Sequence, residues 1–230
     1  MERKRFWSAF LAVLVLTGCG AGPGGAVSVF PEEEKPVAGA VTPAEEPEEE
    51  FQIGEMNGGV YTNEFLGIGC ALDGNWVYYS DEQMAELNGL VQETITDEEV
   101  LEAMKNSDSF YDMYAAADDG LVSINVVVEN LGVLYGFTLD EAGYIDMSIE
   151  SVESIIPDLG LTDYTLETHT LPLAGKERQA LRLAGNMSGV PFYEEIVCIK
   201  RGNYMAVVTM SSAVEDVTQN VASLFYALDA

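Results

Sequence analysis

The chain has 230 residues, and its 39 acidic residues outnumber its 10 basic residues to give a formal net charge of −29. Such a surface excludes nucleic acid as a partner, because phosphate binding needs Lys and Arg, and anionic lipid head groups repel it as well. Such a negative charge instead keeps a protein soluble and prevents it from binding to polyanions.

A short basic stretch, Arg3-Lys4-Arg5, opens the chain, and an apolar run follows from Phe6 to Leu16. This run is too short to cross a bilayer, which takes about 20 apolar residues. A basic start, a short apolar centre and small residues before a cut describe an export signal. Such a signal is either a plain secretory signal or the signal of a lipoprotein.

The segment Leu16-Thr17-Gly18-Cys19 resembles the bacterial lipobox. The resemblance implies that residues 1–18 are a lipoprotein signal peptide and that Cys19 receives a diacylglycerol and, in the mature protein, acyl chains such as palmitate. Each buried methylene contributes about 0.8 kcal/mol, so two acyl chains hold such an anchor in the membrane. We therefore expect a lipid-anchored protein on the outer, extracytoplasmic side of the cell membrane.

Residues 19–57 mix Gly, Ala, Pro and Val with acidic runs at 32–34 and 45–50. They offer no periodic apolar face to bury, so we expect the lipidated Cys19 to be followed by a disordered acidic linker. About 38 such residues reach on the order of 35 Å, and like charges extend them further.

Residues 58–230 are long enough for one domain with a sizeable core. Capping boxes, in which Ser or Thr precedes Glu or Gln by three residues, mark four helix starts. They are Ser80…Gln83, Thr96…Glu99, Thr138…Glu141 and Ser212…Glu215. They predict helices over 81–88, 97–105, 138–156 and from 212 toward 228.

Strands are predicted between these helices. Asp119-Gly120 and Arg201-Gly202-Asn203 are hairpin signals that each join two apolar runs. The predicted strands cover 65–72, 76–79, 110–117, 121–129, 163–171, 177–184, 192–200 and 204–210. The order predicts an α+β fold in which helices flank a mainly antiparallel sheet.

Several short motifs occur in the order that is typical of PsbP-like domains. They are Tyr61–Ile68, Asn75-Trp76, the helix start Ser80–Gln83, Ala174–Glu177 and Ile199–Tyr204. The resemblance covers most of residues 58–230 and implies an α/β/α sandwich around about seven antiparallel strands. It also implies that the domain binds a partner rather than catalysing a reaction.

The single histidine, His169, is either a base paired with a nucleophile or a surface histidine in a polar strand, and we favour the second interpretation. A lone histidine without a soft second ligand nearby does not predict a zinc site. The sequence contains no Gly-x-Ser-x-Gly elbow and no phosphate loop. We predict no catalytic residues, no metal and no cofactor, so the chain is not expected to be an enzyme.

Two cysteines remain for the domain. Cys70 and Cys198 are either a disulfide between an early and a late strand or two separate buried thiols. Sequence does not decide between these alternatives.

Aromatic residues gather at Trp76, Tyr78 and Tyr79 and again around Tyr111. They are either a binding surface, since aromatic residues anchor interfaces, or core residues of alternating strands, which is the interpretation we favour.

These features favour a membrane-tethered, non-enzymatic module that binds or assembles an envelope protein. The alternatives are a surface receptor for a small ligand and an envelope enzyme that uses carboxylates. A flat, exposed apolar patch in the structure would favour the first function, and a deep pocket with converging polar groups would favour the others. The partner and the oligomeric state are left open by the sequence.

Overall fold

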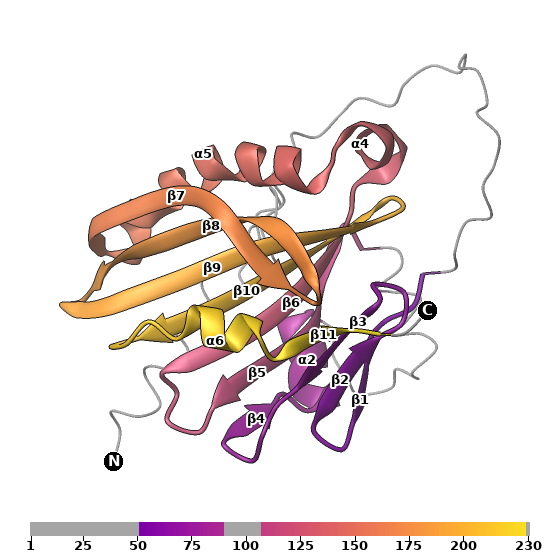
Figure 1. The fold of residues 1–230 in the computed structure, drawn as a ribbon, viewed down its shortest axis with the longest axis horizontal. Coiled ribbons are helices and arrows are strands. Elements are labelled where there is room, and N and C mark those ends of the chain that lie inside the picture. Colours follow the sequence, from indigo (N-terminus) through magenta and orange to yellow (C-terminus); the bar gives the residue numbers. More distant parts are fainter. Residues whose placement is uncertain (1–50, 90–106, 229–230) are drawn as a thin grey trace.

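The computed structural model describes residues 51–89 and 107–228 (Figure 1). A seven-stranded sheet runs in the order β4-β5-β6-β10-β9-β8-β7, and a four-stranded sheet in the order β1-β2-β3-β11. The strands of the large sheet are β4 (Trp76–Tyr78), β5 (Ser109–Ala117), β6 (Val122–Asn130), β7 (Leu161–Leu173), β8 (Lys176–Met187), β9 (Val190–Arg201) and β10 (Tyr204–Ala213). Those of the small sheet are β1 (Glu55–Asn57), β2 (Val60–Asn63), β3 (Ile68–Ala71) and β11 (Phe225–Ala227).

The described helices are α2 (Asp81–Leu87), α4 (Gly132–Thr138), α5 (Glu141–Leu159) and α6 (Thr218–Ala222). The paired strands of both described sheets run antiparallel, which confirms the predicted α+β class with mainly antiparallel sheets.

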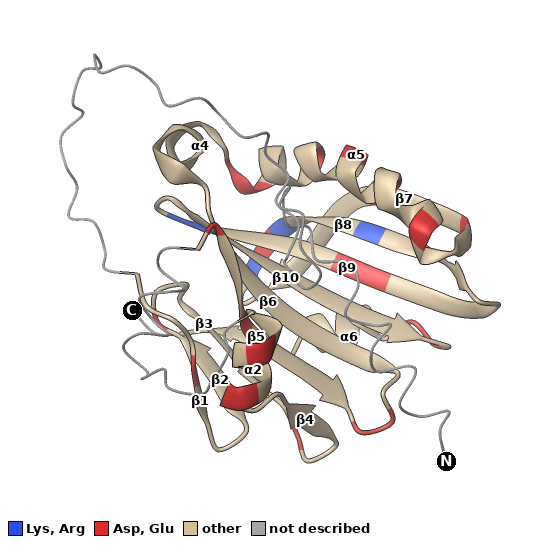
Figure 2. Cartoon of the chain, turned by 180° about the vertical axis from the view of Figure 1, so that it is seen from behind, with Lys and Arg blue, Asp and Glu red and all other residues tan. Residues whose placement is uncertain are grey.

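The large sheet has a different covering on each face. Helices α2 and α5 lie on one face, which we call the helical face, and the small sheet and α6 lie on the other (Figures 1 and 2). One core joins the small sheet to the large one and includes Tyr61, Ile68, Val126, Val208 and Phe225. A second core lies beneath α5 and includes Ile145, Val152, Leu181, Ile196 and Val207. A second sheet therefore takes the place of one helical layer of the predicted sandwich.

Local signals predicted several elements correctly. Gly120 and Gly202 adopt positive φ angles of 70° and 54° in the two predicted hairpins. Ser80 and Gln83 form the predicted capping box at the start of α2. In α5, Ile145, Val152 and Ile156 are buried at the spacing of an apolar stripe along one helix face. The helix ends at Gly160, which adopts the left-handed conformation.

Other helix starts were predicted wrongly. The cap of α5 is Asp140, whose carboxylate accepts a hydrogen bond from the Gly143 backbone N–H at 2.8 Å, whereas Thr138 ends the preceding helix α4. The helix predicted from Ser212 is absent from the described residues, because Ser212 lies in β10, paired with Val122 and Tyr193. The chain then forms only the short α6 before it joins the small sheet as β11.

The folded part begins earlier than the predicted boundary at residue 58. Phe51 is buried among Phe65, Phe110 and Tyr204, and β1 pairs with β2. The strand predicted over 65–72 is shorter, because positive φ at Gly67 belongs to a turn that precedes β3. The predicted helix over 97–105, the signal peptide, Cys19 and most of the linker lie outside the described residues.

Asp112 connects the two sheets. It lies at a bulge of β5, between Tyr111 and Met113. Its carboxylate accepts hydrogen bonds from the Gly54 N–H at 2.8 Å, from the Asn63 amide at 2.9 Å and from the Tyr61 hydroxyl. Burial raises the pKa of Asp112, and the three hydrogen bonds oppose that rise. One carboxylate on the large sheet thus orders the segment before β1 and the strand β2.

We expect Asp112→Ala to destabilise the fold by on the order of 3 kcal/mol, because it leaves three partly buried donors without their acceptor. Urea denaturation of the purified protein measures this change. Asp118→Ala is the matched control, since Asp118 is exposed in the hairpin that follows the same strand. Equal stability of the two variants would contradict the role given to Asp112.

Candidate functional site

Helix α4 presents apolar side chains to solvent. Val133, Leu134 and Phe137 are 70%, 57% and 71% exposed. Among the described residues, five large apolar side chains are more than half exposed, and three of them are on this one helix. Isolated exposed apolar residues are common, but a contiguous group on a short helix indicates a docking surface.

The backbone around α4 holds it against the hairpin between β9 and β10. The Leu131 N–H donates to the Asn203 carbonyl oxygen at 2.8 Å, and the Asn130 side chain accepts from the Gly132 N–H at 3.0 Å. Gly136 faces Asn203 so closely that a Cβ at this position would lie 2.1 Å from the Asn203 Oδ1 atom. Glycine therefore lets the helix approach the hairpin, and the apolar side chains point away from it.

Phe51, the first described residue, lies at the same end of the domain. Its ring stacks on Tyr204 with centroids 4.6 Å apart, and Tyr204 begins β10 directly after the hairpin that holds α4. The ribbon agrees, because the indigo start of the described chain, the β9–β10 hairpin and α4 lie at one end of the molecule (Figure 1). We call this the tether end.

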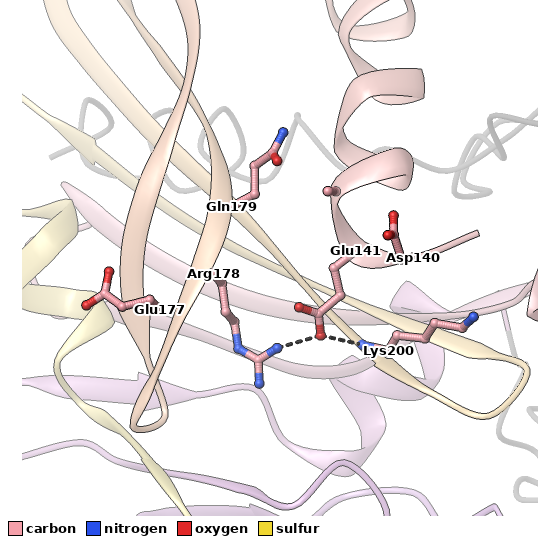
Figure 3. Close-up of a pocket in the computed structure, with 7 residues that line it drawn as sticks. Asp140, Glu141, Glu177, Arg178, Gln179 and Lys200 are labelled. Atoms are coloured by element: carbon pink, nitrogen blue, oxygen red, sulfur yellow. Dashed lines mark hydrogen bonds and ion pairs between the residues drawn. The ribbon is translucent and has the colours of Figure 1, made fainter. Parts of the chain in front are cut away.

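A charged hollow lies beside the start of α5, shortly after α4 ends (Figure 3). It has a volume of about 410 Å³ and is lined by Asp140, Glu141, Ala142, Glu177, Arg178, Gln179 and Lys200. The Glu141 carboxylate accepts from the Arg178 guanidinium and, at 3.0 Å, from the Lys200 backbone N–H. The lining carries both signs of charge, so it suits a polar side chain at the rim of an interface.

The four aromatic residues that were considered as a binding surface do not form one patch. Trp76 and Tyr78 pack against the core shared with the small sheet, and the Tyr78 hydroxyl donates to the Cys70 carbonyl oxygen at 3.1 Å. Tyr111 is buried on the helical face with Val127. The fourth residue, Tyr79, packs its ring against Tyr114 with centroids 4.3 Å apart. Trp76, Tyr78 and Tyr79 are half-buried and Tyr111 is buried, an arrangement that fits the favoured interpretation, core packing.

Of the two alternatives left open for the cysteines, the structure has the unpaired one. Cys70 and Cys198 are both free and buried. Cys70 belongs to the core on the small-sheet side, whereas Cys198 lies in the core beneath α5. The two thiols are on opposite faces of the large sheet, so the second alternative, two separate buried thiols, is the correct one.

His169 is more than a surface histidine in a polar strand. Its Nε2 atom lies 2.7 Å from Oε2 of Glu195, whose side chain is completely buried. Arg182 contacts the other oxygen of Glu195 at 2.7 Å and also pairs with Asp216. These contacts join three strands of the large sheet to the segment before α6. The sequence concealed these contacts because Glu195 is 26 residues from His169 and 13 from Arg182, and Asp216 is 34 residues from Arg182.

The neighbouring Glu194 faces the opposite side of β9. Its Oε2 atom accepts from the Ser211 hydroxyl at 2.7 Å, and its Oε1 atom has no hydrogen-bond partner in the part of the chain that is described. Burial raises the pKa of Glu194 to about 8. The adjacent pair Glu194-Glu195 is visible in the sequence, but its division between two buried faces is not.

We expect the stability of the fold to decrease as the pH rises from about 4.5 to about 8, because Glu194 then ionises in the unfolded chain and stays protonated in the folded one. Glu194→Gln removes this contribution. It should make the pH dependence shallower and raise the free energy of unfolding at pH 7 by on the order of 2 kcal/mol.

Urea denaturation at several pH values measures the effect, with Glu167→Gln on the exposed side of β7 as the control. An unchanged pH profile in the Glu194 variant would show that this carboxyl is not buried as described.

Comparison with known proteins does not assign the chain to a family. No protein-family model matches it, and no curated protein matches its sequence. Among the described residues, no helix is long and apolar enough to span a membrane.

Proposed function

We propose that this chain is a lipid-anchored extracytoplasmic protein whose domain is a non-enzymatic module for binding an envelope protein. The observation that carries the proposal is the apolar surface of α4, formed by Val133, Leu134 and Phe137 at the tether end. The Cys19 lipid holds the chain on the membrane, and α4 provides the docking surface.

The composition of the tether end supports a protein partner. Protein interfaces combine a few apolar or aromatic anchors with a polar rim. Phe137 and Leu134 supply the anchors, and the charged hollow beginning at Asp140 supplies the rim. The absence of a charged residue within α4 itself favours a desolvated contact.

The tether makes a weak contact effective. The 31 residues between Cys19 and Phe51 reach on the order of 30 Å as a flexible chain. A partner in the same membrane within that distance meets α4 at a high effective concentration, so a modest interface suffices. This argument favours a partner in or on the same membrane.

The PsbP-like assignment is part of the same proposal. Support comes from the order of its motifs in the sequence and from the mainly antiparallel α+β fold.

We expect Cys19→Ala to release the protein from the membrane fraction. The substitution removes the only thiol that the signal sequence offers for acylation, and the described residues contain no membrane-spanning helix. Fractionation of cells and metabolic labelling with a fatty acid measure both effects. Membrane retention of the variant, or labelling of the wild-type chain elsewhere, would contradict the anchor.

A photoreactive residue at position 137 should crosslink in living cells to one envelope protein, because this side chain is the most exposed anchor of α4. Val77, which is 55% exposed in β4, is the matched control position. The same protein should co-purify with the wild-type chain and be reduced at least tenfold with Phe137→Asp. Because Phe137 is exposed, this variant should keep its thermal stability.

Two results would overturn the docking role of α4. The first is crosslinking of position 137 to lipid alone. The other is equal capture of the same protein from positions 137 and 77.

A further inference from the structure

Positive charge is scarce in this acidic chain, and part of it is concentrated at the tether end. The described part of the chain contains five basic residues, Lys176, Arg178, Arg182, Lys200 and Arg201. The last two are consecutive at the end of β9, in the hairpin that holds α4 (Figure 2). We call Lys200 and Arg201 the hairpin cations.

The hairpin cations are open to solvent, unlike the two arginines of β8. Arg178 is buried and pairs with Glu141, and Arg182 pairs with Glu195 and Asp216. Arg201, in contrast, is exposed, and Lys200 is half-buried. A guanidinium and an ammonium group that solvent reaches can bind a carboxylate that arrives from outside the described fold.

The chain enters the domain directly beside Arg201. Tyr204 is the cross-strand partner of Arg201, so the two side chains share one face of the hairpin. The Tyr204 ring stacks on Phe51 with centroids 4.6 Å apart, and edge contacts with Phe65 and Phe110 fix Phe51 further. The residues that precede Phe51 are therefore attached to the domain within reach of the Arg201 side chain.

These preceding residues carry the longest acidic run of the linker. The run, residues 45–50, consists of five glutamates and one proline and ends at the residue before Phe51. Six extended residues span at most about 20 Å, so all five carboxylates are held close to the hairpin. Such attachment gives them a high effective concentration at the hairpin cations. A single exposed ion pair is weak, but several charges that act together can form a stable contact.

We propose that the acidic run 45–50 binds the hairpin cations, with Arg201 as the main contact. Five carboxylates face two cations, so several glutamates share the contact and no single one is essential. The contact holds the exit of the tether at the hairpin to which the Leu131 N–H attaches α4. The tether then leaves the domain beside the docking surface, a consequence that rests on the proposed function, whereas the contact itself does not.

Carbodiimide crosslinking of the purified, detergent-solubilised lipoprotein, followed by peptide mass spectrometry, tests this contact. The reagent joins a carboxylate to a neighbouring amine, and Arg201→Lys places an amine at the main contact. We expect position 201 to crosslink to the run at low ionic strength. The yield should fall about fivefold in 1 M salt, where the Debye length is about 3 Å. Lys176, which is exposed at the start of β8, is the control amine and should link to the run much less.

Charge reversal gives a second measurement on the natural lysine. Arg201→Glu should reduce crosslinks between Lys200 and the run about fivefold, because like charges repel. Lys176→Glu is the matched control and should leave them unchanged. Crosslinks between Lys200 and Glu177, which both line the charged hollow, are the internal standard.

Phe137→Asp should leave the crosslinks from position 201 unchanged, so failure of this contact and failure of the α4 docking surface are separate results. Three results would overturn the proposal. They are crosslinks that do not depend on salt, equal linking of the run to Lys176 and to position 201, and unchanged linking of Lys200 in the Arg201→Glu variant.

Discussion

Every central strand of the seven-stranded sheet is buried on both faces, since helices cover one face and a second sheet covers the other. In such a sheet, the side chains of successive residues along one strand point into different cores. Glu195 therefore joins an ion-pair network on one face, while Glu194 lies beneath the other. The same alternation separates Cys198 from Cys70.

Two-sided burial also determines where the molecule can make contacts. Because the faces of the large sheet are occupied, extensive exposed apolar surface is found at an end of the described structure, on α4. The close approach of Gly136 to Asn203 and the stacking of Phe51 on Tyr204 place α4 beside the start of the described chain. The proposed anchor and the proposed docking surface thus lie at one end of the domain.

The elements that could be predicted from sequence are those with local causes. Glycines at the turns predict the hairpins, and the capping box of Ser80 and Gln83 predicts α2. The spacing of the apolar residues along α5 predicts that helix. Pairing between distant segments overrode local preference elsewhere. Ser212 resembles a helix cap but is held as a strand between β6 and β9, and β11 pairs with β3 across more than 150 residues.

The candidate sites were hidden for related reasons. Helix α4 lacks a side-chain cap and a charged face, so no periodic signal marks it. The alternation in β6 places Ser123 and Asn125 on one face, but the residues opposite them, Ser211 and Thr209, come from a strand that only the tertiary fold brings alongside.

The central claim is that α4 is covered by a partner when the protein is in its membrane. Carbene footprinting of intact cells, compared with the purified protein, measures the accessibility of Leu134 and Phe137 directly. We expect strong labelling of both residues in the purified protein and protection of both in cells, with Val77 labelled equally in the two samples. Equal labelling of α4 in cells and in the purified protein would contradict it.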